Sequence, residues 1–66
     1  MSVLYNLKSK IDQTIEAKKL DSSAVRGKIA LQAGFLLSLI NPNSPDDPVK
    51  IEKLRKAAES VMQVKL

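Results

Sequence analysis

The chain contains neither cysteine nor histidine in its 66 residues, and this absence restricts how so short a polypeptide can be stabilised. Short chains bury a small fraction of their surface on folding, so small domains commonly add disulfides, a metal ion, a very apolar core or a second copy. Without cysteine no disulfide forms, and without histidine the usual zinc ligands are missing too. Residues 1–66 are therefore expected to form a single small domain that relies on helix packing and self-association.

The composition predicts an aliphatic core. Hydrophobic residues make up 44% of the chain, but its aromatic residues are limited to Tyr5 and Phe35. The longest weakly polar run, residues 29–40, is shorter than the roughly 20 apolar residues that a transmembrane helix needs. The N-terminal stretch lacks the charged and apolar regions of a signal peptide. We expect a cytoplasmic protein that does not bind membranes.

The periodicity of apolar residues predicts an all-α fold with three helices and no β-strand. The helices are expected over residues 2–20, 24–40 and 47–63, with breaks near residues 20–24 and 41–47. This arrangement is either a three-helix bundle or a helical hairpin with an additional arm. In both cases we expect dimerisation to complete the fold.

Capping residues support these boundaries. Asp21 and the two serines after it can accept hydrogen bonds from the free backbone N–H groups of a second helix. Asn41-Pro42 ends that helix, because the residue before proline is disfavoured in helical conformation. Asp47 can cap the third helix, and Pro48 suits its first position because proline lacks an N–H group.

Nine residues are expected to form the core, because they share the apolar faces of the three predicted helices. They are Leu7, Ile11, Ile29, Leu36, Ile40, Ile51, Leu54, Ala58 and Val61.

The predicted second helix is apolar on two separate arcs. At 100° per residue, the broad arc contains most of its apolar side chains, and the second arc contains Leu31, Phe35 and Leu39. The narrow apolar stripes of the other two helices can cover about one arc. The second arc is therefore expected to contact another copy of the chain or a different protein, since soluble monomers rarely expose large apolar patches. The alternative is that the first and third helices splay apart and cover both arcs within one chain.

Gly27 and Gly34 lie between the two arcs, together with other small residues. Glycine in a helix interior costs about 1 kcal/mol relative to alanine, so a reason for both is expected. The spacing predicts close approach of a neighbouring helix, and the two glycines are included in the predicted interface. The alternative is that Gly34 breaks the helix, or that both glycines are tolerated without a structural role.

No constellation in the sequence predicts catalysis, and we expect no catalytic residues, cofactor or metal ion. Activated nucleophiles usually need a histidine or cysteine, and the chain has neither. Asp46 and Asp47 are better explained as helix-capping residues than as a catalytic pair. A calcium loop needs oxygen ligands at fixed spacing and a glycine at its turn, whereas the loop around Asn43 is rich in proline.

Taken together, the sequence predicts a non-enzymatic helical protein-interaction module, such as a small adaptor, regulator or assembly subunit. Its expected partners are itself, as a homodimer or larger assembly, and another protein. The alternative is a small DNA-binding transcriptional regulator with a degenerate helix-turn-helix around residues 26–41. In that alternative Gly34-Phe35-Leu36 is the turn and Leu37 begins the recognition helix. That helix would be short and apolar, whereas recognition helices present polar side chains to base edges, so nucleic acid is not an expected partner.

Overall fold

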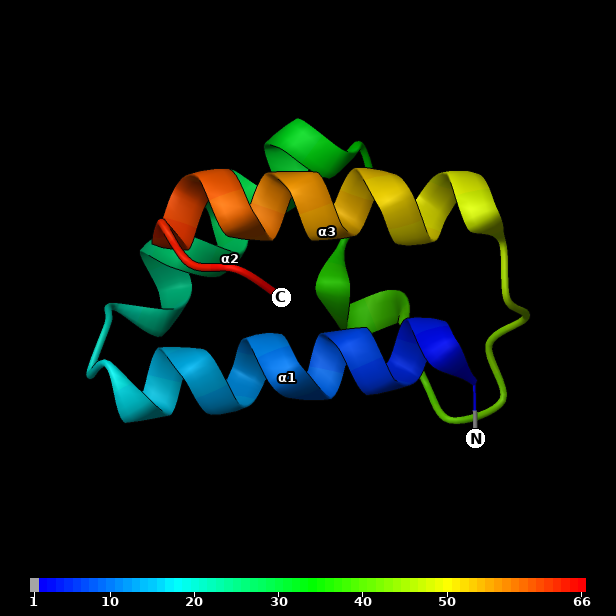
Figure 1. The fold of residues 1–66 in the computed structure, drawn as a ribbon, viewed down its shortest axis with the longest axis horizontal. Coiled ribbons are helices and arrows are strands. Elements are labelled where there is room, and N and C mark those ends of the chain that lie inside the picture. The colour runs from blue at the N-terminus through cyan, green and yellow to red at the C-terminus, as the bar shows by residue number, and fades with distance from the viewer. Residues whose placement is uncertain (1) are drawn as a thin grey trace.

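The computed structural model describes residues 2–66, which fold into three α-helices and a short 3-10 helix without any β-strand. In chain order these are α1 (Val3–Ala17), α2 (Ser22–Ala33), the 3-10 helix η1 (Leu37–Leu39) and α3 (Pro48–Met62) (Figure 1). The all-α prediction is confirmed.

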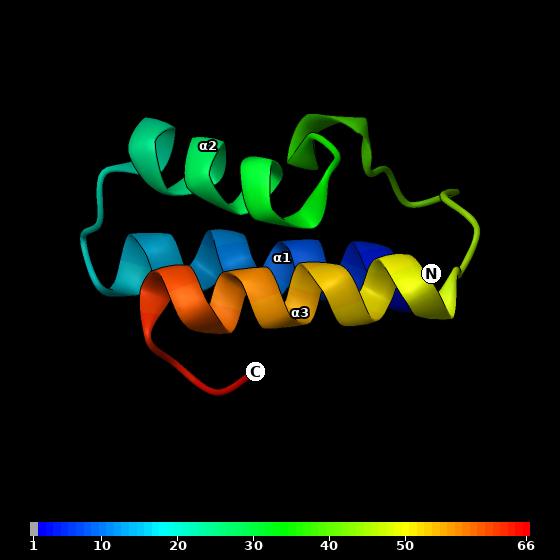
Figure 2. The same ribbon diagram turned by 90° about the horizontal axis from the view of Figure 1, so that it is seen from above.

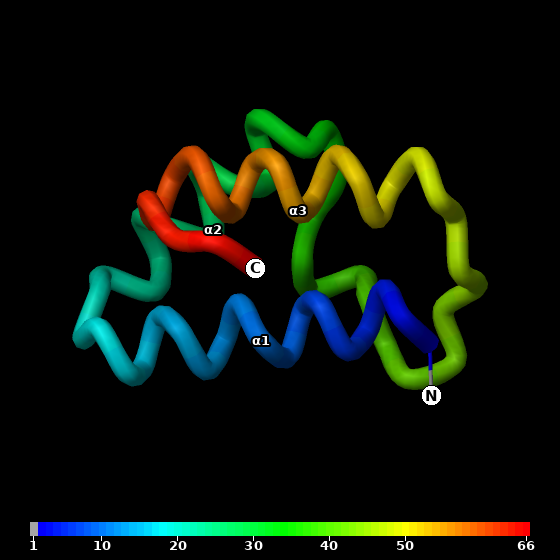
Figure 3. Tube along the Cα trace, viewed as in Figure 1, coloured from blue at the N-terminus to red at the C-terminus, as the bar shows by residue number. Residues whose placement is uncertain are grey.

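The helices form two layers. α1 and α3 lie side by side and run in the same direction, and α2 packs across them in the opposite direction (Figure 1 and Figure 2). The tube in Figure 3 shows how residues 40–47 return the chain to the end where α1 begins. The radius of gyration of 10.7 Å matches the value of about 11 Å expected for a compact domain of this length. The arrangement is therefore a bundle and not a hairpin with a separate arm.

α1 begins at a serine cap and ends three residues earlier than predicted. Ser2 Oγ accepts a hydrogen bond from the backbone N–H of Tyr5 at 3.0 Å. At the other end Lys19 adopts a left-handed conformation with φ of 53°, and Leu20 N–H donates back to the Ile15 carbonyl at 2.9 Å. This is the usual hydrogen-bond pattern of a helix that ends in a left-handed residue.

α2 begins two residues earlier than predicted and ends seven residues early, so the predicted helix to Ile40 is wrong. Asp21 Oδ1 accepts from the N–H of Ala24 at 3.2 Å and caps the helix. Gly34 then takes a left-handed conformation with φ of 86°, and its N–H donates to the Ala30 carbonyl at 2.8 Å. Glycine is the usual residue at this position because it has no Cβ. The alternative in which Gly34 breaks the helix is the one observed.

The prediction for α3 is confirmed at both ends within a residue. Asp47 Oδ1 accepts from the N–H of Val49 at 2.9 Å, and Pro48 is the first helical residue. The neighbouring Asp46 has a different role, because its Oδ1 accepts from the N–H of Leu4 at 3.2 Å and so ties the loop to the start of α1. α3 ends where Gln63 becomes left-handed.

All three helices contribute to one core, centred on Ile11, Ile29 and Leu54, which have no exposed surface. Its other members are Leu4, Leu7, Ile15, Ala33, Leu37, Ile40, Ala57, Ala58 and Met62. Six of the nine predicted core residues are confirmed: Leu7, Ile11, Ile29, Ile40, Leu54 and Ala58. Ile51 and Val61 pack at its margin, half-buried. The prediction for Leu36 is wrong, because the helix break turns this side chain outward.

Candidate functional site

The predicted interface residues lie around the C-terminal end of α2, where large apolar side chains are exposed. Leu31, Leu36 and Leu39 are 85%, 56% and 68% exposed, and Phe35 is half-buried against the core. We call these four residues the Phe35 patch. Three of them were predicted from the sequence, and Leu36 joins them because it is excluded from the core.

The patch results from the break at Gly34. Beyond the glycine, Leu36 is extended and Leu37–Leu39 forms a single 3-10 turn. This path directs Leu37 and Ile40 into the core and leaves Leu36 and Leu39 in solvent. The exposed apolar side chains expected on one long helix are therefore present, but they lie where the chain turns between α2 and η1.

Phe35 joins two shallow depressions into a continuous surface. One is lined by Leu31, Leu36 and the small residues of α2, and the other by Leu39 and residues at the start of α3. Phe35 lines both. The ammonium of Lys50 lies 5.8 Å from the centre of the Phe35 ring, within the range of a cation–π interaction.

The two glycines have an open environment in the folded chain. No atom that could obstruct a side chain lies within 4 Å of a Cβ built at Gly27 or Gly34. The close helix approach predicted from their spacing is therefore absent within residues 2–66. Both glycines line the depression beside Leu31 and belong to the surface of α2.

We compared the chain with protein-family models, curated proteins and solved structures. None of them matches.

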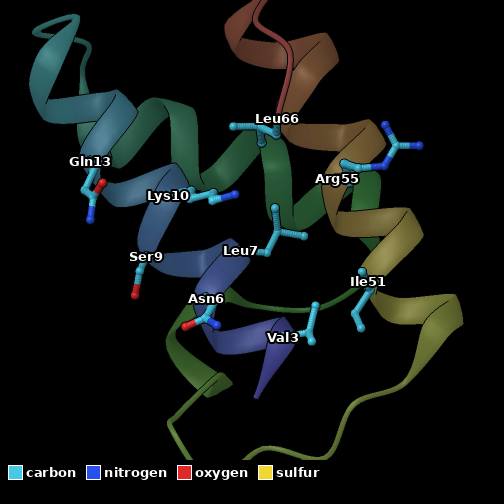
Figure 4. A pocket seen from close by; sticks show the side chains of 9 residues that line it. All are labelled: Val3, Asn6, Leu7, Ser9, Lys10, Gln13, Ile51, Arg55 and Leu66. Atoms are coloured by element: carbon cyan, nitrogen blue, oxygen red, sulfur yellow. The ribbon is translucent and has the colours of Figure 1, made fainter. Parts of the chain in front are cut away.

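A second surface feature is the groove between α1 and α3. Leu7 and Val3 of α1 face Ile51 of α3 and the C-terminal Leu66, whereas the polar side chains of Asn6, Ser9 and Gln13 project away (Figure 4). The C-terminal segment turns back at Gln63 and places Leu66 in this groove. The chain thus partly covers the apolar floor of the groove itself.

Glu59 holds the C-terminal segment in place. Its Oε2 accepts from the N–H of Leu66 at 3.0 Å, and its Oε1 accepts from Arg55 at 2.9 Å. The hydrogen bond from Leu66 lowers the pKa of Glu59, and the charge of Arg55 and its hydrogen bond act in the same direction, against a smaller rise from partial burial. Arg55 also pairs with Glu52, and these two carboxylates raise the pKa of its guanidinium.

We expect acidification to release the C-terminal segment. The folded state lowers the pKa of Glu59, so the stabilising contact is complete above the ordinary pKa of a glutamate and is lost as the pH falls through the lowered value. The amide proton of Leu66, followed by NMR, should report this release with a midpoint below that of an exposed glutamate. Glu59→Gln should abolish the transition. A midpoint at or above the ordinary glutamate value would contradict this expectation.

Among residues 2–66 no three acidic side chains come close enough together to hold a metal ion. None of the helices in this range has both the length and the apolar character to cross a membrane.

Residues 26–41, which the alternative prediction assigns to a helix-turn-helix, contain the turn but not the recognition helix after it. Gly34 and Phe35 do separate α2 from the next element, as that alternative requires. The next element, however, is the three-residue η1, and the chain is extended again at Ile40. A recognition helix must place several side chains along the major groove, and one 3-10 turn is too short for that.

Proposed function

We propose that this chain is a non-enzymatic helical protein-interaction module, a small adaptor, regulator or assembly subunit, that uses the Phe35 patch as its contact surface. The observation that carries the proposal is the exposure of Leu31, Leu36 and Leu39 around Phe35 in so small a domain. Contiguous exposed apolar groups typically mark interaction sites. The absence of cysteine supports a cytoplasmic location, where thiols stay reduced and disulfides are rare.

The proposed contact in the isolated protein is with a second copy. A two-fold axis through the patch covers each copy with the same surface of the other, and such dimers are the commonest soluble oligomers. α2 forms the outer layer of the fold, so its outer side is accessible to another molecule (Figure 2). Burial of exposed leucines favours association, because apolar surface is removed from water.

Sedimentation equilibrium on two matched double variants tests this proposal. Leu31→Gln/Leu36→Gln removes apolar surface from the patch, and Val3→Gln/Val49→Gln removes it from exposed positions that do not line the patch. We expect the wild type and the control variant to dimerise at high micromolar concentration. The patch variant should remain folded and become monomeric. Glutamine avoids adding a charge near the end of α2, and all four positions are exposed, so folding should be preserved.

Two results would contradict the proposal. A wild type that remains monomeric at high micromolar concentration overturns self-association. A dimer that the patch variant leaves intact overturns the location of the contact. Tight binding to double-stranded DNA that falls steeply with salt would instead favour the DNA-binding alternative, because phosphate contacts release counterions.

A further inference from the structure

The Phe35 patch is bordered by lysines of α2 and α3. Lys50 lies over the Phe35 ring, and Lys53 and Lys56 share a depression with Gln32 and Gly34, next to the patch. Lys28 is exposed on α2 one turn before Leu31. We call Lys28, Lys50, Lys53 and Lys56 the lysine rim.

Nearby carboxylates do not neutralise the lysine rim. In the described chain, Lys28, Lys50 and Lys53 form no ion pair, and Lys56 has a long, exposed contact of 3.9 Å with Glu52. Exposed ion pairs of this kind contribute little to the free energy of folding.

The acidic groups of this region are engaged elsewhere. Glu52 and Glu59 pair with Arg55, which lines the groove on the α1 side of α3. Within residues 2–66, Asp47 is the one acidic residue that lines the depressions along the patch, and its Oδ1 caps α3. The patch is therefore an apolar surface with a basic border.

We propose that the Phe35 patch receives an amphipathic helix of a partner protein, with apolar residues on one face and acidic residues beside it. This inference rests on the proposed function and specifies the partner. The apolar face covers Leu31, Phe35 and Leu36, and the acidic side chains pair with the lysine rim. A helix laid into an apolar surface is a common mode of peptide recognition.

Charge complementarity favours this partner over a second copy. A second copy offers the same surface, which has no unengaged carboxylate beside the patch, so it leaves the lysine rim without partners. An acidic helix supplies them, and complementary charges around an apolar centre raise both specificity and association rate. The acidic helix therefore displaces the second copy from the dimer by competing for the patch.

The probe is a synthetic amphipathic peptide with leucines on one helical face and glutamates on its flanks, together with a twin in which lysine replaces every glutamate. We expect fluorescence anisotropy with the wild-type protein to show about ten-fold or greater preference for the acidic peptide at low salt. Added salt should reduce the preference, because exposed charges are screened. Leu31→Gln/Leu36→Gln should abolish binding.

Charge variants then locate the basic border. Lys28→Glu/Lys53→Glu should weaken binding of the acidic peptide about ten-fold and improve binding of the basic twin. Lys10→Glu/Lys18→Glu changes the net charge equally, but its lysines lie on or just after α1, and neither lines the patch. This control should bind as the wild type does.

The outcomes distinguish this inference from the proposed function. Equal binding of the two peptides, or equal weakening by both charge variants, overturns the acidic partner and leaves the interaction surface intact. The acidic partner is also overturned, and the interaction surface again left intact, if the protein binds neither peptide but still dimerises through the patch. If Leu31→Gln/Leu36→Gln changes neither dimerisation nor peptide binding, the proposed function itself fails.

Discussion

Ile29→Ala should unfold a large part of the protein population, with an expected loss of about 2–5 kcal/mol in the free energy of unfolding. Ile29 has no exposed surface and lies on α2 where that helix packs on the other two. Removing its side chain leaves a cavity at the centre of the core. Small domains often have total stabilities of a similar size, so the effect should be visible as a lower melting temperature and a lower urea midpoint.

Leu31→Ala is the matched control, two residues further along the same helix. Leu31 is almost fully exposed, so its truncation should change the unfolding free energy by less than about 0.5 kcal/mol at concentrations where the protein is monomeric. Similar losses in the two variants would show that the outer side of α2 is also packed, contrary to the observed burial.

Leu37→Ala should also cost about 2–5 kcal/mol, although Leu37 lies outside the α-helices. Its side chain is 3% exposed because the break at Gly34 and the turn of η1 direct it into the core. The adjacent Leu36→Ala should have a small effect, since Leu36 points into solvent. Equilibrium urea unfolding of both variants, again at monomer concentrations, measures the contrast.

The comparison of Leu36→Ala with Leu37→Ala also tests whether the helix ends at Gly34. In a helix that continued to residue 40, Leu36 and Leu37 would both lie on the broad apolar arc, and both truncations would be severely destabilising. Equal losses of unfolding free energy would therefore contradict the helix break at Gly34.

Local signals were sufficient to predict most of the fold. Asp21 and Asp47 are capping residues in the structure as in the sequence, and the stripe of α1 buries the expected side chains. The stripe of α3 buries Leu54 and Ala58 as expected but leaves Ile51 and Val61 half-buried. The end of α2 was mispredicted because the apolar pattern continues smoothly through Gly34. Either a long helix or a helix with a turn satisfies that pattern, and tertiary packing of Leu37 and Ile40 decides between them. A glycine one position after a complete helix is the signal that favours the turn.

The interaction surface was predicted in part. Leu31, Phe35 and Leu39 were expected because the chain has more apolar side chains on residues 24–40 than two narrow stripes can cover. Leu36 was missed together with the helix end. The lysine rim was missed because its members lie on two helices, Lys28 on α2 and the others on α3, and Lys50 reaches the Phe35 ring only because α3 packs against α2. Only the tertiary fold brings them together.

The parallel course of α1 and α3 has an electrostatic consequence at the end of the molecule where both helices begin. Each helix start carries the positive end of a macrodipole, equivalent to roughly half an elementary charge, and parallel neighbours place these ends on the same side, where they repel. Asp46 and Asp47 are consecutive in the chain but serve different helices, because one accepts from α1 at Leu4 and the other from α3 at Val49. Two adjacent carboxylates therefore compensate the positive ends of both helix dipoles. The loop between η1 and α3 thus supplies the negative charge that offsets the repulsion between the two neighbouring helix starts.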